Sequence, residues 1–142
     1  MFWRKRRNKL LMRRLAAHMN ARRYDDVTPM LSACFSYIDA VGSRIDGPGE
    51  FIDAVRLLHL HVPDETVHFN NFSHDGDVLL ITGEIASQQP EYCWSSLWRV
   101  TFSGDKIVEV EVFRENNAVS IPALYHRFQN QAEQAGLAVG SA

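Results

Sequence analysis

Three consecutive runs of strand-forming residues lie between Asp77 and Asn117 and constrain the fold more than any other part of the chain. The runs cover residues 78–87, 92–103 and 107–116 and are rich in Val, Ile, Thr, Trp and Phe. A turn containing Pro90 and a polar turn at 103–105 join them, and connections this short favour antiparallel pairing. A strand as long as the second run extends about 40 Å. A sheet of such strands must therefore bend to enclose a core.

Before this stretch, the spacing of apolar residues predicts helices over residues 2–21, 24–31 and 50–59. Apolar, β-prone runs predict strands over residues 34–40 and 66–73, with a short hairpin arm at 41–45. In the first helix Leu11, Leu15 and Met19 recur at four-residue spacing, which predicts an apolar stripe that packs on the sheet. A last helix is predicted over residues 122–134, with Leu124 and Phe128 on one side.

This order of elements predicts an α+β fold, in which a curved, mainly antiparallel sheet wraps around about three N-terminal helices. The length of 142 residues suits one domain spanning residues 1–142. Within it, residues 1–9 form a basic N-terminal extension and residues 136–142 a loose tail. No apolar run approaches the ~20 residues that cross a membrane, and the N-terminus lacks the apolar segment of a secretory signal.

The two cysteines, Cys34 and Cys93, both fall in strand-like runs. Their positions predict two buried, reduced thiols in a cytoplasmic protein. Neither the cysteines nor the scattered histidines have metal-ligand spacing, so the sequence predicts no metal site and no cofactor. His61 or His126, near the pocket mouth, is a candidate acid–base partner.

Charge is distributed unevenly along the chain. Nine basic and no acidic residues precede residue 24, whereas the remaining six basic and seventeen acidic residues give the rest of the chain a net charge of −11. Such a basic segment can complement the acidic body, or it can mark a surface for nucleic acid or acidic lipid. We predict a solvated face with no nucleic-acid or membrane partner, because the body would repel phosphate and only Trp3 interleaves with the basic residues.

Several strings, in this order and spacing, resemble the nuclear transport factor 2-like superfamily, which includes SnoaL-like cyclases and ketosteroid isomerases. They occupy residues 16–21, 24–26, 30–31, 37–42, 47–52, 98–102 and 104–107. The resemblance covers the chain from about residue 10 to 118. It implies a cone, formed by a curved sheet around helices, with a deep pocket at its open end. It also implies a homodimer that pairs through the sheet.

Asp39 is the candidate catalytic residue, in the string Asp-Ala-Val-Gly. This string resembles the one in which ketosteroid isomerases carry their proton-shuttling carboxylate. A carboxylate at an apolar pocket wall can have its pKa raised towards neutrality, as a general base needs. The structural alternative is that Asp39 caps the turn before Gly42 or pairs with an arginine.

The remaining isomerase pattern is absent. The positions of the isomerases' oxyanion-hole tyrosine and hydrogen-bonding acid fall at or near Leu15 and Trp98. Neither side chain can reproduce the short O–H donation that stabilises a dienolate. The sequence therefore does not support ketosteroid isomerase activity itself.

Five further residues are candidates for lining the pocket: Tyr37, Trp94, Trp98, Val112 and Arg114. Trp94 and Trp98 share a strand face, where they form either an aromatic wall or plain core. Arg114 either turns inward, towards a substrate carboxylate or Asp39, or lies outward at a strand end.

Two functions follow from these residues. In the first, the chain binds a small apolar or aromatic molecule in the cone, as a cofactor-independent isomerase, dehydratase or cyclase. In the second, it is a non-catalytic ligand- or protein-binding dimeric module. The first requires at least two polar groups that face one cavity, and the second does not.

Overall fold

The computed structural model describes residues 2–39, 42–114, 122, 125–127 and 129–130. The helices are α1 (Phe2–Asn20), α2 (Tyr24–Val27) and α3 (Pro48–His61), with 3₁₀ turns η1 (Thr28–Met30) and η2 (Pro90–Tyr92). The strands are β1 (Leu31–Asp39), β2 (Arg44–Asp46), β3 (Thr66–Asp75), β4 (Val78–Ala86), β5 (Trp94–Ser103) and β6 (Lys106–Arg114). The described residues from 122 to 130 are helical, whereas Leu124, Phe128 and the tail lie outside the described part.

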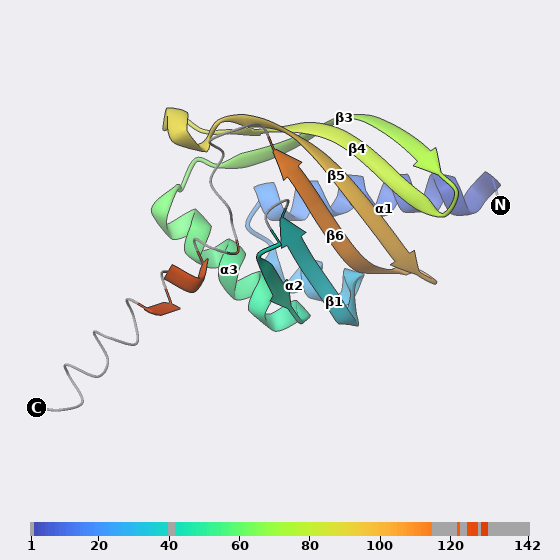
Figure 1. Cartoon of the computed structure of the whole chain (residues 1–142), viewed down its shortest axis with the longest axis horizontal. Helices are drawn as coiled ribbons and strands as arrows, with labels where there is room; N and C mark the ends of the chain where they lie inside the picture. The colour runs from blue at the N-terminus through green and yellow to red at the C-terminus, as the bar shows by residue number, and fades with distance from the viewer. Residues whose placement is uncertain (1, 40–41, 115–121, 123–124, 128, 131–142) are drawn as a thin grey trace, which may run out of the picture.

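One six-stranded sheet has the order β2-β1-β6-β5-β4-β3. Every neighbouring pair is antiparallel except β1 and β6, which run parallel. Figure 1 shows the long strands β3 to β6 curving past α1, with α3 beside β1. The α+β fold with a curved sheet over three helices is therefore confirmed.

The buried core lies between the sheet and the helices. In α1, Met12, Leu15 and Met19 are buried, while Leu11 is only half-buried at the edge of the stripe. In α3, Phe51 and Val55 are buried against the inner face of the sheet. Helix α3 begins at Pro48, a favoured first helical residue because its missing N–H would have no partner there. None of the helices in the described part of the chain is long and apolar enough to span a membrane.

The segment predicted as a second helix, residues 24–31, divides into three pieces. Only α2 is α-helical, and η1, which contains Pro29, follows it. Leu31 already belongs to β1, where it pairs with Ile107 of β6. The helix prediction was too long because this strand pairing outweighs local helix propensity once Pro29 has removed a backbone donor.

Strict alternation along the last predicted strand places Val108, Val110 and Val112 on one face and Ile107 and Phe113 on the other, and this prediction is wrong for Ile107. The register of β6 against β5 shifts between Thr101 and Phe102, so that Phe102 pairs with Ile107 and Val108 has no partner. This bulge turns Ile107 inward, where it is buried, and leaves Phe113 on the outer face.

The prediction that both cysteine thiols are buried is also wrong. Cys34 and Cys93 are exposed free cysteines, and Cys93 precedes β5 rather than lying in it. The Cys93 thiol donates a hydrogen bond to the Ser87 carbonyl oxygen at 2.8 Å. The strand-like composition was misleading because η2 delays the start of β5 by two residues relative to the sequence pattern.

Candidate functional site

Strand β1 supplies the first two candidate residues. Phe35, Tyr37 and Asp39 alternate along one face of β1 and are all buried. Because β1 pairs in parallel with β6, Tyr37 lies opposite Val110 and Asp39 lies opposite Val112. The structure therefore brings the candidates Tyr37, Asp39 and Val112 together on the inner side of the sheet.

Strand β5 continues this surface, because Trp98 pairs with Val112. The ring of Trp98 meets the ring of Tyr37 edge-on, with 6.4 Å between centroids, and Phe51 of α3 lies 5.4 Å from Tyr37. The Trp98 Nε1–H donates to Ser96 Oγ at 2.7 Å. Tyr37 and Trp98 are almost fully buried, so in this structure they are part of the core as well as the aromatic inner surface.

Arg114 lies at the end of β6 and turns towards this inner surface. Its Nη2 donates a hydrogen bond to the Tyr37 hydroxyl oxygen at 3.0 Å. Its guanidinium also lies over the ring of Trp94, 4.6 Å from the centroid. A guanidinium over an indole face is held by cation–π attraction, which fixes its orientation. Arg114 thus connects Tyr37 to Trp94.

Asp39 is 6% exposed and makes the contact that its structural alternative requires. Its Oδ1 accepts a hydrogen bond from the Ser43 backbone N–H at 3.0 Å. The Asp39 backbone N–H donates to the Ser43 carbonyl oxygen, also at 3.0 Å, and Gly42 takes φ +86° within the turn. One carboxylate oxygen therefore helps to hold the turn after β1, next to the proposed pocket wall.

The indole of Trp94 carries a polar atom without a partner in the described part of the chain. Its Nε1 is buried and makes no hydrogen bond there. Buried N–H groups are rarely left unpaired, and each exception calls for an explanation such as a ligand or an ordered water. Because the same ring supports Arg114, two donor groups lie close together at this end of the inner surface.

The hydroxyl of Tyr37 is protonated at neutral pH. Burial raises the pKa of Tyr37, and the neighbouring Arg114 guanidinium opposes that shift without cancelling it. The carboxylates of Asp39 and Glu65 raise it further. The buried Tyr37 O–H can therefore serve as a hydrogen-bond donor.

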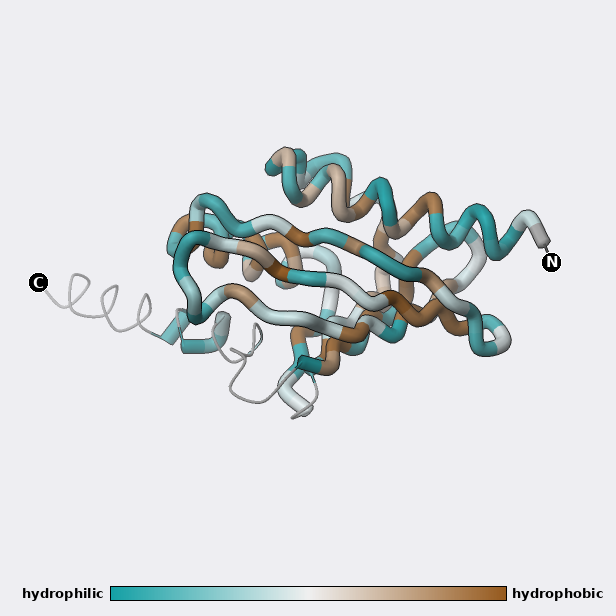
Figure 2. The backbone as a smooth tube through the Cα atoms, turned by 90° about the horizontal axis from the view of Figure 1, so that it is seen from above, coloured by the Kyte–Doolittle hydropathy of each residue, from teal (hydrophilic) through white to brown (hydrophobic). Residues whose placement is uncertain are grey.

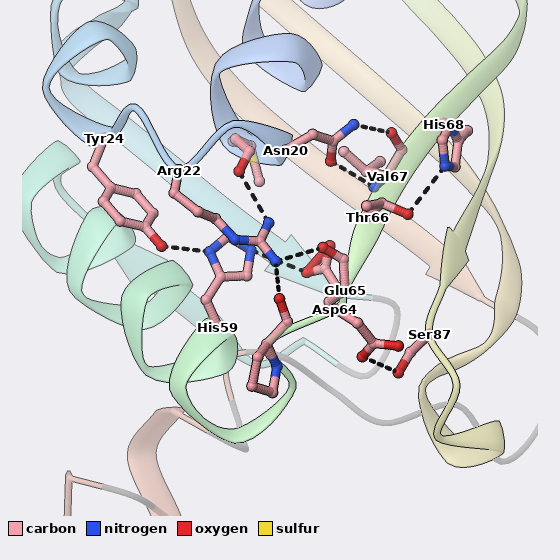
Figure 3. Close-up of polar contacts among 12 residues, drawn as sticks. Asn20, Arg22, Tyr24, His59, Asp64, Glu65, Thr66, Val67, His68 and Ser87 are labelled. Atoms are coloured by element: carbon pink, nitrogen blue, oxygen red, sulfur yellow. Dashed lines mark hydrogen bonds and ion pairs between the residues drawn. The ribbon is translucent and has the colours of Figure 1, made fainter.

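A second polar cluster, which the sequence did not reveal, lies where α2, α3 and the start of β3 meet (Figure 3). The Tyr24 hydroxyl lies 2.6 Å from His59 Nδ1, and His59 Nε2 lies 3.5 Å from Glu65 Oε2. The His59 and Glu65 side chains are 5% and 4% exposed. The second contact has an ion-pair distance but no hydrogen-bond geometry, so His59 Nε2 is without a hydrogen-bond partner among the described residues. Burial raises the pKa of Tyr24, although the charges of Arg22 and Arg56 oppose it.

The last residue of α1, Asn20, and Arg22 just after it tie this cluster to the chain around it. Arg22, with φ +61°, donates to the carbonyl oxygens of Pro63 and Glu65 at 2.7 and 2.8 Å. Asn20 exchanges two hydrogen bonds with the backbone of Val67, at 2.8 and 2.9 Å (Figure 3). These contacts fasten the end of α1 to the start of β3, so the cluster has an evident structural role. Nothing in the local sequence around Glu65 signals its burial, because Arg22 and Tyr24, which complete the cluster, are distant in the chain.

The remaining chemistry of the site is limited. In the part of the chain that the structure describes, no three His, Cys, Asp or Glu side chains are grouped so that they could hold a metal ion. Leu15 and Trp98, at the positions of the isomerases' oxyanion-hole donors, are both buried apolar side chains. His126 contacts the Arg44 carbonyl oxygen at 3.2 Å, beside β2.

No protein-family model matches the sequence, and no curated protein matches it. Several solved structures, in contrast, are similar to this chain in fold. A candidate ketosteroid isomerase from Kribbella flavida DSM 17836 has a TM-score of 0.67 at 14% identity, over 81% of this chain and 82% of that one. A candidate SnoaL-like polyketide cyclase from Jannaschia sp. CCS1 has a TM-score of 0.65 at 16% identity, over 77% and 85%.

A third structure, a hypothetical protein with a ketosteroid isomerase-like fold from Catenulispora acidiphila DSM 44928, was solved in complex with trimethylamine. Its TM-score is 0.63 at 14% identity, over 72% of this chain and 82% of that one. At these identities the likeness is one of fold, and it agrees with the strand order and helix placement described above. The chain therefore has the nuclear transport factor 2-like fold.

Proposed function

We propose that the chain binds a small apolar or aromatic molecule on the inner side of its sheet and acts on it without a cofactor. The reaction class is isomerisation, dehydration or aldol-type cyclisation, with Asp39 as the proton shuttle. Tyr37, Trp98 and Val112 form the wall of this site, and Arg114 with Trp94 receives an acceptor group of the ligand. We expect the protein to act in the cytoplasm, where its two free thiols stay reduced.

The observation that carries this proposal is the set formed by Arg114, Tyr37 and Trp94. A guanidinium fixed between a buried hydroxyl and an indole, beside an indole N–H that has no partner among the described residues, is suited to a carboxylate or carbonyl oxygen. The buried Asp39 carboxylate follows Tyr37 on the same strand face. The trimethylamine-bound neighbour supports the proposal only in that this fold accommodates a small ligand.

The bond between Asp39 and Ser43 favours a second candidate function, a non-catalytic binding module. In that case Asp39 holds the turn and Arg114 with Trp94 binds a ligand that is not transformed. Both functions share the same binding residues, so binding is tested first and proton transfer is tested separately.

Binding can be measured with phenylacetate, which combines an aromatic ring with a carboxylate, and with neutral phenylacetamide as the comparison. We expect phenylacetate to quench tryptophan emission saturably, and Arg114→Gln to weaken its binding roughly 10-fold or more because a charge-assisted bond is lost. Trp94→Phe should weaken binding of both probes, since it removes a donor to their oxygen. Arg99→Gln on the exposed side of β5 is the matched control. Equal losses in Arg114→Gln and Arg99→Gln would contradict the proposed site.

A further inference from the structure

We propose that the N-terminal half of α1 and the β3–β4 turn form a second site, which binds a phosphate-type oxyanion through Arg4, Asn8 and His74. This site lies at the opposite end of the sheet from Asp39. Strands β5 and β6 run from the Ser96–Arg114 pair, near Asp39, to the Ser103–Lys106 pair beside this second site. Figure 1 shows the N-terminal end of α1 reaching the same end of the molecule as the β3–β4 turn.

The burial of the polar residue Asn8 in α1 needs an explanation. It is only 4% exposed, yet its Oδ1 is buried without a hydrogen-bond partner, and no described residue bonds to its amide nitrogen. An unpaired buried amide destabilises the folded chain, so a core position would favour an apolar residue instead. A ligand that bonds to the amide would remove this cost.

Two other buried polar atoms that have no hydrogen-bond partner among the described residues lie around Asn8: Nε of Arg7 and Nε2 of His74. Arg7 is already fixed in place, because its Nη2 donates to the Gly104 carbonyl oxygen at 2.7 Å. The three atoms come from one turn of α1 and from β3, so one local irregularity of the backbone does not account for them. They provide donors and acceptors from several directions.

The structure also provides space at this position. One cavity, of about 240 Å³, and another, of about 180 Å³, both have Arg4, Asn8 and Asp77 in their walls. The first is completed by Arg7 and Gly104, among others, and the second by residues that include His74. Because they share three wall residues, the cavities adjoin one another, with Asn8 between them.

The local charge of this region favours an anion, contrary to the expectation from sequence that the acidic body repels phosphate and leaves the basic helix as a solvated face. Arg4, Lys5 and Arg7 contribute three positive charges to the cavity walls, and Asp77 contributes one negative charge. The contact between Arg4 and Asp77 is 3.8 Å long, and the two side chains are 61% and 92% exposed, so it holds Arg4 weakly. No acidic side chain of the described residues lies within ion-pair distance of Lys5. Figure 2 shows that this half of α1 is mostly hydrophilic.

A tetrahedral phosphate group matches this set of side chains. Arginine forks pair with phosphate oxygens through two parallel hydrogen bonds, and lysine adds a point charge. A singly protonated phosphate also has an O–H that can donate to the Asn8 carbonyl oxygen or to His74 Nε2. The phosphate can be part of a dissolved phosphoryl compound or of a lipid headgroup. A lipid headgroup as the source is supported by Trp3 and Leu10, which are 72% and 47% exposed on the outer side of the same helix.

The test compares potassium phosphate with potassium chloride at equal ionic strength, by thermal unfolding of four proteins: the unaltered chain, Arg4→Gln, Asn8→Leu and Arg14→Gln. Phosphate stabilises most proteins slightly by exclusion from their surface, and this shift should appear in all four. Binding at the site should add a saturable rise in Tm of roughly 3–6 °C at ten times Kd. We expect Arg4→Gln and Asn8→Leu to lose this additional rise. Arg14→Gln, which removes the same charge from an exposed position outside both cavities, should keep it.

The variant Asn8→Leu distinguishes a phosphate-binding site from a buried amide that only destabilises the core. Without added phosphate its Tm should equal or exceed that of the unaltered chain, because an unpaired amide has been removed. If Asn8→Leu fails to fold, Arg4→Gln alone decides, since Arg4 is exposed. A phosphate response that is retained in Arg4→Gln, or lost equally in Arg4→Gln and Arg14→Gln, would overturn the proposal.

Vesicles identify the source of the phosphate group. Sedimentation with phosphatidylglycerol vesicles, but not with phosphatidylcholine vesicles, would assign a lipid headgroup if Arg4→Gln and Asn8→Leu lose it and Arg14→Gln keeps it. A response to dissolved phosphate alone, with the same dependence on the variants, would assign a soluble phosphoryl compound. If neither phosphate nor vesicles act on the unaltered chain differently from these two variants, no such site exists.

Discussion

At the scale of single residues, the two functions differ at the Asp39 carboxylate. The hydrogen bond from Ser43 occupies one lone pair of Oδ1, and an ionised carboxylate has about four such positions. Holding the turn and accepting a proton are therefore compatible roles. Asp39→Asn keeps the acceptor oxygen for Ser43 and removes the base.

We expect Asp39→Asn to lower proton transfer by about 10²–10⁴-fold, the usual contribution of a positioned general base. A suitable measurement is the deuterium exchange of the methyl protons of acetophenone, followed by proton NMR after its binding has been shown by tryptophan quenching. Binding should survive the substitution. Asp46→Asn, which alters an exposed carboxylate on the paired strand β2, is the matched control.

If Asp39 serves only to hold the turn after β1, the opposite pattern is expected. Asp39→Asn would then lower Tm while exchange stayed at the level of the unaltered chain. That combination would end the catalytic proposal and leave the binding module.

The sequence predicted some of these residues and missed others for a physical reason. Strand alternation was enough to place Tyr37 and Asp39 on one face, because it depends only on neighbours in the chain. The contact of Trp94 with Arg114 and the contact of Glu65 with Arg22 depend on partners on other elements of the chain. Their roles in the site could not be read from local patterns.

At the scale of elements, the pairing of α1 with the β3–β4 hairpin has a consequence for pH. Burial lowers the pKa of His74 on β3 from its ordinary value of 6.5, and the charges of Lys5 and Lys9 on α1 lower it further. A histidine with a lowered pKa binds its proton more readily in the unfolded chain. The contribution of neutral His74 to the free energy of unfolding is therefore complete above pH 6.5. It is lost as the pH falls towards the folded-state pKa of His74.

We expect Tm to fall as the pH is lowered from about 7 to 5, and His74→Gln to flatten part of that fall. Thermal unfolding at constant ionic strength measures the change, and NMR titration of the His74 ring measures its pKa directly. His68→Gln, on the same strand but with an exposed ring, is the control. A His74 pKa at or above 6.5 in the folded protein would contradict this prediction.

Element boundaries show where sequence reasoning succeeds and where it stops. Apart from the start of β1, which lies three residues before the predicted one, the long helices and strands were placed to within about two residues, because their patterns extend over several turns or pleats. The short elements were not. A single bulge at Val108 reversed the predicted face of Ile107, because side-chain direction in a strand changes with each added residue.

At the scale of the whole molecule, the outer face of the sheet supports the proposed homodimer. Leu97 and Phe113 pair across β5 and β6 and are 39% and 38% exposed. They border a shallow depression of about 370 Å³ that also includes Thr82 and Ser95. Apolar side chains surrounded by polar ones on a strand surface are typical of an interface.

We expect sedimentation to show a dimer at micromolar concentration, and Leu97→Glu to weaken it roughly 10-fold or more by burying a charge. Leu60→Glu is the control, because Leu60 is 75% exposed on α3, away from the sheet. A monomer at micromolar concentration, or equal effects of the two substitutions, would contradict the predicted interface.

The parallel pairing of β1 with β6 has a kinetic consequence. Every other neighbouring pair of strands is antiparallel and close in the chain, whereas this pair joins Leu31 to Ile107 and Asp39 to Val112. The chain between them must be brought into place before their contacts form, so the entropy of loop closure opposes this step more than any hairpin. We therefore expect β3 to β6 to form early in refolding and β1 to join late. The Tyr37–Arg114 bond spans the same gap, so ligand binding would appear only after that last step.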